Sequence, residues 1–283
     1  RYTVGMSNTS VRWGILGTGW IADRFVEDLK RLLGHSTVAI GSRSMASAET
    51  FAKAHGVAKS HGSYEALVAD PEVDVVYVAT PHPLHHPNAR LALEAGKPVL
   101  VEKPFTMDAK EAADLVALAR KKNLFLMEAM WTRFLPHIAR IRDILQAGTL
   151  GEIVTVQADH GQWFAKNPEH RLFAPKLGGG ALLDLGIYPV SFAAFALGQP
   201  SRITAVSDKA FTGVDGQTSI LLQHKSGAHA VLNTTLSAAT PNRAAIVGTE
   251  ARIEIDRTYY CPSSFTVTHR DGRILERYDT PYE

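Results

Sequence analysis

The first 130 residues alternate between short apolar runs and longer segments with a helical spacing of apolar side chains. The runs are continuous rather than alternating, which is typical of strands buried on both faces. Helical segments of about 10 to 15 residues separate them, so the pattern predicts a parallel sheet covered on both faces. The right-handed crossover rule then favours a doubly wound fold. The predicted strands cover residues 11–17, 37–41, 73–79, 98–101 and 124–128, and the predicted helices cover 20–33, 45–55, 83–95 and 108–122.

The pattern changes after Met130. Two more helices are predicted, at 134–146 and 181–197, and a half-buried strand between them at 151–160. Further strand-like runs follow Pro200, separated by Gly and Pro turns, at 202–206, 219–224, 228–235, 244–247, 252–255 and 264–269. Consecutive strands joined by short turns indicate an antiparallel sheet. We therefore expect an α/β chain with a doubly wound domain in residues 1–130 and an α+β domain with a mostly antiparallel sheet in residues 131–283.

Composition narrows the range of partners and compartments. Among 283 residues, 30 are Lys or Arg and 28 are Asp or Glu, a net charge of +2 that does not indicate nucleic-acid binding. Cys261 is the single cysteine, which fits a reducing compartment. No signal peptide is apparent, and no apolar run is expected to reach the roughly 20 residues of a membrane span. We expect a cytoplasmic protein with neither nucleic-acid nor membrane partners.

A glycine-rich turn follows the first predicted strand and opens the first helix. It reads Gly17-Thr18-Gly19-Trp20-Ile21-Ala22, the G-x-G-x-x-A pattern of a dinucleotide-binding Rossmann domain. Gly17 allows the tight turn, Gly19 lets the backbone approach a pyrophosphate, and Ala22 keeps the helix close to the sheet. The helix N-terminus offers free N–H groups to the phosphates. The alternative is a merely structural turn.

The end of the second predicted strand distinguishes between the two nicotinamide cofactors. Proteins that bind NAD usually place an acid about 20 residues past the turn, to hold the ribose 2′-hydroxyl. Here the sequence is Ser42-Arg43-Ser44, with no acid between residues 37 and 48. A guanidinium attracts a 2′-phosphate that a carboxylate would repel, and the serines add hydroxyl donors. We predict NADP(H), with NAD(H) as the alternative cofactor and a solvated Arg43 as the alternative interpretation.

A lysine follows the strand predicted at residues 98–101. The sequence there is Glu102-Lys103-Pro104, and the carboxyl ends of parallel strands face the ligand crevice. Lys103 could hydrogen-bond the reacting oxygen, stabilise an alkoxide or relay a proton. From the spacing alone, an exposed Glu-Lys pair explains the segment equally well.

Three motifs together resemble the glucose–fructose oxidoreductase and inositol dehydrogenase family. These are the glycine turn, Glu102-Lys103-Pro104, and the segment that runs from Gly178-Gly179-Gly180 through Asp184 and Tyr188 to Pro189. The resemblance extends from about Val11 to Val247. It implies that Lys103 is catalytic, that Glu102 and Pro104 shape the loop at the nicotinamide, and that the second domain binds substrate and mediates oligomerisation.

The third motif departs from the pattern of many family members. They read D-x-G-x-H with a histidine as acid–base residue, whereas this chain has Asp184 and then Tyr188. The tyrosine, together with residues 127–134, resembles the dimeric dihydrodiol dehydrogenase branch, which includes NADP-linked D-xylose dehydrogenases. That resemblance implies Tyr188 as acid/base, Lys103 assisting and Asp184 positioning. Two alternatives stay open: Asp184 as a helix cap, and Tyr188 as a core residue with its hydroxyl paired.

Other candidate residues are less specific. Three histidines, His82, His85 and His86, follow the strongest strand, but their spacing fits no zinc pattern and no metal is expected. The resemblance places Thr80, Pro81, His82 and His85 near the cofactor. The faces of aromatic side chains stack well on sugars and diene rings, so Trp131, Trp163 and Phe164 are candidate substrate contacts, and Trp131 is also expected near the cofactor. His160 and Arg171 are further candidate substrate contacts. Core packing explains these aromatic residues equally well.

These observations favour an NADP(H)-dependent oxidoreductase that acts on the CH–OH group of a sugar or trans-dihydrodiol. The alternatives are an NAD-linked cyclitol or aldose dehydrogenase, a non-catalytic dinucleotide sensor, and a glycosidase that oxidises its substrate transiently. The resemblance implies a homodimer or homotetramer through the C-terminal sheet. It also implies a helical tail after the point where this sequence stops.

Overall fold

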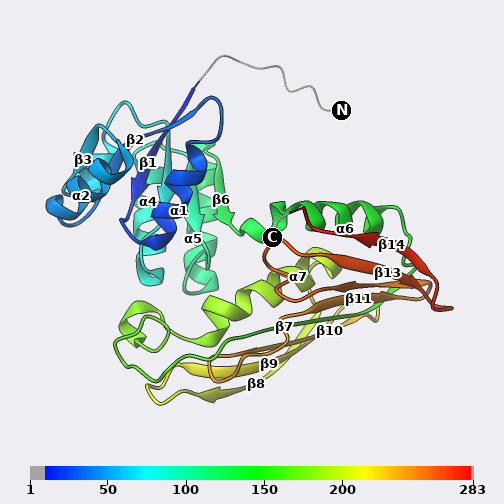
Figure 1. Ribbon diagram of the computed structural model, residues 1–283. Helices are drawn as coiled ribbons and strands as arrows, with labels where there is room; N and C mark the ends of the chain where they lie inside the picture. The colour runs from blue at the N-terminus through cyan, green and yellow to red at the C-terminus, as the bar shows by residue number, and fades with distance from the viewer. Residues whose placement is uncertain (1–9, 282–283) are drawn as a thin grey trace. The chain divides into compact units, whose positions relative to one another are not determined.

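A computed structural model describes residues 10–281, which form two compact units divided after Ala129 (Figure 1).

The N-terminal unit is built on a six-stranded parallel sheet with the strand order β3-β2-β1-β4-β5-β6 (Figure 1). The strand order reverses between β1 and β4. The connection after β1 therefore leads to β2 on one side, and the connection after β4 leads to β5 on the other side. A crevice at such a switch point is where doubly wound sheets bind ligands. The strands are β1 Val11–Leu16, β2 His35–Gly41, β3 Lys59–His61, β4 Val75–Val78, β5 Val99–Glu102 and β6 Leu126–Ala129.

Helices cover both faces of this sheet, as predicted. Successive strand residues point to opposite faces, and Ile15 and Leu16 of β1 accordingly belong to two different apolar clusters. The helices are α1 Trp20–Leu29, α2 Met45–His55, α3 Tyr64–Val68, α4 His85–Glu94 and α5 Ala109–Lys122, with a 3₁₀ turn η1 at His82–Leu84. Helix α1 is shorter than the predicted 20–33, and Leu33 beyond it is 92% exposed.

The C-terminal unit is built on an eight-stranded, mostly antiparallel sheet, which confirms the predicted fold class. Its order is β14-β13-β12-β11-β7-β10-β9-β8, and only the β7–β10 pair in it is parallel (Figure 1). The strands are β7 Ile153–Gly161, β8 Arg202–Lys209, β9 Asp215–Gln223, β10 His229–Thr235, β11 Ala244–Gly248, β12 Ala251–Ile255, β13 Phe265–His269 and β14 Ile274–Tyr278. The sequence patterns did not predict β3, α3 or β14.

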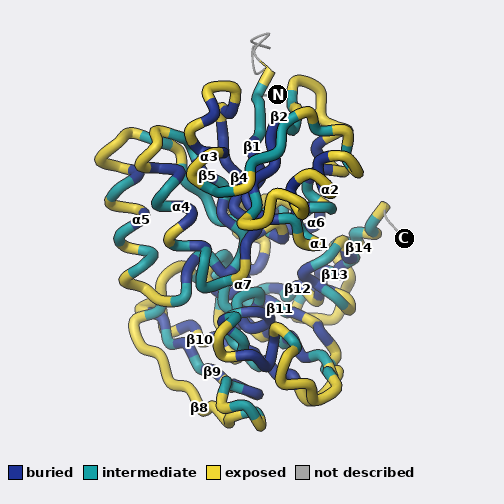
Figure 2. Tube along the Cα trace, turned by 90° about the vertical axis from the view of Figure 1, so that its left-hand side faces the viewer, coloured by how far each residue is buried: buried dark blue, intermediate teal, exposed yellow. Residues whose placement is uncertain are grey.

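Two helices cover one face of the eight-stranded sheet, α6 Pro136–Gln146 and α7 Ile187–Leu197 (Figure 1). Burial alternates along the strands beneath them (Figure 2). In β10, Ala230 and Leu232 are buried against the helices, whereas His229 and Val231 are exposed on the other face. Short 3₁₀ turns lie at Trp131–Phe134 (η2) and Pro175–Leu177 (η3).

The helix predicted at 181–197 has a different first turn. Residues Leu182–Gly186 form a π-helical turn, η4, and the α-helix begins only at Ile187. Contrary to the sequence prediction, the continuous run Pro175–Leu197 is 23 residues long and apolar enough to pass a length and composition test for a membrane span. Core helices pass the same test, and Phe192 and Ala193 of this run lie in the apolar core of the unit.

Candidate functional site

The glycine turn of the N-terminal unit is fixed where the sheet order reverses. Gly17 has φ +108°, and a Cβ there would lie 2.5 Å from the carbonyl oxygen of Ala79. The Gly17 amide donates to Gly41 O of β2 at 3.0 Å, and the Ala79 amide donates to Leu16 O at 2.9 Å. Neighbouring backbone from two strands therefore leaves no room for a side chain at this turn.

Gly19 and the first turn of α1 form an open backbone surface. Gly19 is the extended N-cap of α1, and a Cβ built on it would meet no atom within 4 Å. Ala22 is fully buried against the sheet, whereas Trp20 is 71% exposed. The first amides of the helix are thus accessible from the side of Gly19, which fits the approach of a pyrophosphate.

The residues after β2 place an arginine beside a tyrosine. Arg43 is exposed and hydrogen-bonds the side chain of Tyr64, at the start of α3. Ser42 Oγ accepts from the Ser44 amide at 3.3 Å, and Ser44 Oγ caps α2 by accepting from the Ser47 amide at 3.3 Å. Both hydroxyl groups keep a hydrogen to donate. Tyr64 was not among the predicted site residues, because it lies in a helix that the sequence pattern did not indicate.

Lys103 follows β5 and is held next to a carboxylate. The Lys103 amide donates to Glu102 Oε2 at 3.1 Å, and the hydroxyl of Tyr77 donates to Glu102 Oε1. Burial raises the pKa of Glu102, although the Tyr77 hydroxyl and the charge of Lys103 oppose this shift. The Lys103–Pro104 peptide bond is cis. Glu102 therefore anchors the backbone from which the Lys103 side chain extends.

His85 ties the lysine loop to the end of β4. Its Nδ1 lies 2.7 Å from Pro104 O and its Nε2 lies 2.8 Å from Thr80 O. The side chain is 1% exposed, and burial lowers its pKa. The next amide, that of Phe105, donates to Glu128 Oε1 at 3.0 Å. His85 thus supports the loop from beneath rather than lining an open surface.

The other histidines of this segment lie in different surroundings. The ring of His82 packs edge-on to His85, with centroids 5.6 Å apart. His86 turns to α5, where its Nε2 lies 2.8 Å from Asp114. Across residues 10–281, no three His, Cys, Asp or Glu side chains are grouped so as to hold a metal ion.

In the C-terminal unit, the π-helical turn carries a buried acid paired with an arginine. Asp184 accepts from two nitrogens of Arg171, at 2.8 and 3.2 Å. The Asp184 side chain is 4% exposed and that of Arg171 is 56% exposed, so the arginine reaches the surface. The cap of this turn is Asp215, whose Oδ2 accepts from the Leu182 amide at 2.6 Å. Asp184 therefore binds an arginine and is not the helix cap.

Tyr188 lies one turn further along the same helical run. It is partly buried, and its hydroxyl accepts from Trp131 Nε1 at 3.3 Å. Trp131 is 44% exposed. The tyrosine hydroxyl therefore lies near the surface of this unit with Trp131 as one of its hydrogen-bond donors.

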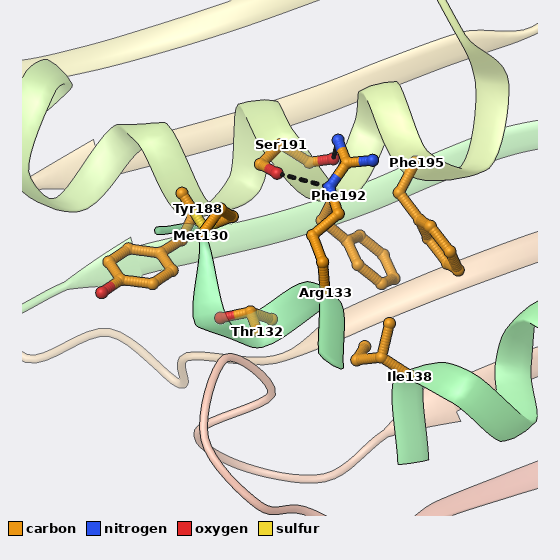
Figure 3. A pocket seen from close by; sticks show the side chains of 8 residues that line it. All are labelled: Met130, Thr132, Arg133, Ile138, Tyr188, Ser191, Phe192 and Phe195. Carbon is orange, nitrogen blue, oxygen red and sulfur yellow. Dashed lines mark hydrogen bonds between the residues drawn. The ribbon is translucent and has the colours of Figure 1, made fainter. Parts of the chain in front are cut away.

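Figure 3 shows a small pocket behind the Tyr188 ring, in which Arg133 donates to Ser191 Oγ at 3.1 Å beside Phe192 and Phe195. Its volume of about 10 Å³ leaves room for roughly one water molecule. The Tyr188 hydroxyl points away from this pocket (Figure 3). Substrate would therefore meet Tyr188 on the other side.

The remaining predicted contacts differ in exposure. His160 is 2% exposed, Phe164 packs with Leu172 and Leu236, and Trp163 is 67% exposed. Two residues next to Tyr188 or His160 were not predicted, Gln162 and Tyr260. Gln162 lies two residues after the candidate His160, whereas Tyr260 is brought to His160 only by the fold.

The chain was compared with known families and proteins. Residues 11–130 match the oxidoreductase family with an NAD-binding Rossmann fold, and residues 138–254 match the GFO/IDH/MocA C-terminal domain. Trans-1,2-dihydrobenzene-1,2-diol dehydrogenase of Xenopus tropicalis is 39% identical over 277 residues, which cover 96% of this chain and 82% of that enzyme. The Mus musculus enzyme is 40% identical over 254 residues, 88% of this chain and 76% of the enzyme.

Solved structures are similar along nearly the whole chain. The 3-ketoreductase KijD10 of Actinomadura kijaniata, in complex with NADP and TDP-benzene, has a TM-score of 0.86 and 30% identity, over 97% of this chain and 86% of that one. Aldose-aldose oxidoreductase from Caulobacter crescentus, complexed with glycerol, has a TM-score of 0.87 and 26% identity, over 97% and 84% of the two chains.

Proposed function

The chain belongs to the Gfo/Idh/MocA family of NAD(P)-dependent oxidoreductases, and from this premise we propose that it transfers hydride between NADP(H) and a CH–OH group of a sugar or trans-dihydrodiol. Tyr188 is the acid/base residue and Lys103 assists it. The observation that carries the proposal is the Tyr188 hydroxyl, which lies at the surface of its unit with Trp131 as donor.

The N-terminal unit has the features that a dinucleotide needs. Gly17 and Gly19 form a turn in which one glycine is required by packing and the other leaves the helix amides open. When bound, the nicotinamide supplies the hydride acceptor or donor. Lys103 is held at the end of β5 by Glu102 and by the His85–Pro104 contact. Its ammonium supplies the positive charge that favours an alkoxide or phenolate nearby.

The protein's part in the reaction is proton transfer. During oxidation, the C–H electron pair leaves as hydride and the substrate hydroxyl proton moves to the Tyr188 phenolate oxygen, which becomes a hydroxyl. During reduction, Tyr188 returns that proton to the alkoxide oxygen. Arg171 supports this role at a distance, because it holds Asp184 in the turn that precedes the tyrosine.

Preference for NADP(H) over NAD(H) rests on Arg43. Its guanidinium is exposed, Tyr64 orients it, and Ser42 and Ser44 retain hydroxyl hydrogens beside it. A planar cation flanked by hydroxyl groups suits a phosphate monoester such as the ribose 2′-phosphate.

Replacement of Tyr188 by Phe tests the catalytic assignment. We expect turnover to fall by about 10²- to 10⁴-fold, since a general acid/base contributes that much. The dissociation constant for NADPH, measured by fluorescence titration, should change by less than about threefold because the tyrosine hydroxyl does not hold the cofactor. Unchanged turnover in this variant would refute the role of Tyr188, and unchanged structure by circular dichroism is the control.

A further inference from the structure

Two aromatic rings, those of His160 and Tyr260, pack against the ring of Tyr188. The rings of His160 and Tyr260 are stacked, with centroids 3.9 Å apart and an angle of 24°. Tyr188 packs edge-on to His160 at 5.2 Å and tilted against Tyr260 at 5.1 Å. His160 and Tyr260 are 2% and 8% exposed. The stacked pair thus packs against the Tyr188 ring from two sides and restricts its rotation.

Gln162 connects the two stacked rings by hydrogen bonds. Its amide Nε2 lies 3.0 Å from His160 Nε2, and its side chain also hydrogen-bonds the hydroxyl of Tyr260. An amide nitrogen only donates, so His160 Nε2 must be the acceptor and Nδ1 must carry the proton. This tautomer is the one that can donate to Leu185 O, which lies 3.1 Å from Nδ1. Every polar atom of the imidazole is therefore used, and the ring is held in one orientation.

The carbonyl that His160 binds belongs to the turn before Tyr188. Pro189 stands four residues after Leu185 and has no amide hydrogen to donate to Leu185 O, which instead accepts from the Ile187 amide at the end of the π-helical turn. His160 supplies a side-chain donor to the same oxygen. The same imidazole therefore contacts the Tyr188 ring and the backbone that carries it.

Tyr260 is anchored independently. Thr132 Oγ1 donates to Tyr260 O at 2.8 Å, and the neighbouring Tyr259 O lies 2.9 Å from His137 Nε2. Burial raises the pKa of Tyr260 to about 12, so its phenol keeps its proton at neutral pH. A protonated phenol adds no charge beside Tyr188.

We propose that Gln162, His160 and Tyr260 form a positioning cluster that holds the Tyr188 side chain in the orientation required for proton transfer. Simple core packing would need only apolar rings at these places. Instead, the polar groups of Gln162, His160 and Tyr260 are matched to one another and to the carbonyl oxygen of Leu185. The proposal rests on the assignment of Tyr188 as acid/base residue, and its test must separate the two.

A double-mutant cycle makes that separation. Gln162→Leu removes the amide donor and His160→Phe keeps a ring but removes both hydrogen bonds. Each variant is made in the natural sequence and in Tyr188→Phe. In the natural background we expect kcat to fall by about tenfold, as the loss of one oriented hydrogen bond implies, with KM for NADP unchanged. The pH profile of kcat should also shift, because the environment of the titrating phenol changes.

In the Tyr188→Phe background the same substitutions should reduce turnover no further, because a positioning residue acts only through the group that it positions. Gln146→Leu is the control, since Gln146 is an exposed glutamine at the end of α6. It should leave kcat and the pH profile unchanged.

The outcomes distinguish the two hypotheses. If Tyr188→Phe abolishes turnover while Gln162→Leu and His160→Phe leave kcat and its pH profile unchanged, the positioning cluster is refuted and the acid/base role stands. Equal losses in both backgrounds would also refute it, because the effect would then not pass through Tyr188. If Tyr188→Phe itself retains full turnover, the proposed function fails first.

Discussion

Gly17 and Gly19 belong to one motif, but different physical requirements act on them. At Gly17 the backbone has positive φ and a Cβ would collide with the Ala79 carbonyl. At Gly19 the φ is −86° and the space around a Cβ is empty. Folding therefore requires glycine only at the first position, and ligand approach is the remaining reason for glycine at the second.

This difference gives a matched pair of substitutions. Gly17→Ala should lower the free energy of unfolding by about 2 kcal/mol or more, since it combines strained φ with overpacking. Gly19→Ala should leave the unfolding midpoint in urea nearly unchanged and weaken NADP binding by about tenfold or more. Urea unfolding and cofactor titration on both variants measure these effects. Equal stability loss in the two would show that the distinction is wrong.

Arg43 is the residue on which the cofactor preference depends. Arg43→Ala should weaken NADPH binding by about 10- to 100-fold, as expected for a lost hydrogen bond to a charged group, and leave NADH binding nearly unchanged. Tyr64→Phe should have a smaller effect in the same direction, because Tyr64 only orients the guanidinium. If NADPH affinity does not respond to Arg43→Ala, the arginine is a solvated surface residue.

At the scale of elements, the sequence predicted the long helices and strands whose apolar side chains follow a clear helical or strand pattern. Helix α2 has the predicted bounds, and α5 differs only in that Asp108 is its cap. Strand β3 has three polar residues, Lys59–His61, and is a strand because β2 pairs with it, so no local pattern marks it. The sequence pattern does not reveal the π-helical turn η4 either, because the spacing of its apolar side chains is close to that of an α-helix.

The candidate site likewise combines residues that local sequence motifs predict and residues that only the fold brings together. Lys103, Asp184 and Tyr188 were identified because their motifs are local and resemble those of a known family. Tyr260 lies 100 positions after His160, in the loop between β12 and β13, and only the fold brings the two rings together. Asp215 likewise caps η4 from a strand that begins 33 residues later.

An ion pair at the start of the first sheet gives a prediction about pH. Asp74 accepts from the backbone and side chain of Arg12, and these hydrogen bonds lower its pKa below 3.8. A carboxyl with a lowered folded-state pKa stabilises the protein above its unfolded value and loses that contribution as pH falls through the folded value. The contribution should therefore be present at neutral pH and vanish in strong acid.

Asp74→Asn tests this directly. Both side chains are 40% exposed, so solvent screens the pair, and we expect the variant to melt only about 1 to 3 °C lower at pH 7. The difference should shrink as pH falls below the ordinary carboxyl pKa and disappear in strong acid, and Arg12→Gln should show the same pH dependence. A difference that persists in strong acid would mean that the carboxylate charge is not the cause.

For the whole molecule, the uncovered face of the eight-stranded sheet is the feature that bears on assembly. One row across it reads Thr204, Leu221, Val231, Gln157 and Ala245 on five neighbouring strands, and it continues into Glu254 of β12. Val231 is 51% exposed. We propose that this face pairs with the same face of a second copy, because a two-fold axis can bring the uncharged side chains of these five strands against their own copy.

Val231→Glu places a charge at the centre of that row. Sedimentation at micromolar concentration should show a dimer or tetramer for the natural chain and a smaller species for the variant. Gln146→Glu adds the same charge on an exposed helix and should leave the mass unchanged. A natural chain that sediments as a monomer would rule out the proposed assembly.

The central claim is that this chain transfers hydride between NADP(H) and the CH–OH group of a sugar or trans-dihydrodiol, with a net redox change of the nucleotide. The most direct measurement is the steady-state rate of nucleotide reduction with a panel of aldoses, cyclitols and trans-dihydrodiols, with NADP and NAD in parallel. We predict substrate-dependent reduction with at least one aldose or dihydrodiol, faster with NADP than with NAD, and its loss in Tyr188→Phe. Turnover of a glycoside without net nucleotide reduction, or no reduction with any member of the panel, would contradict the account.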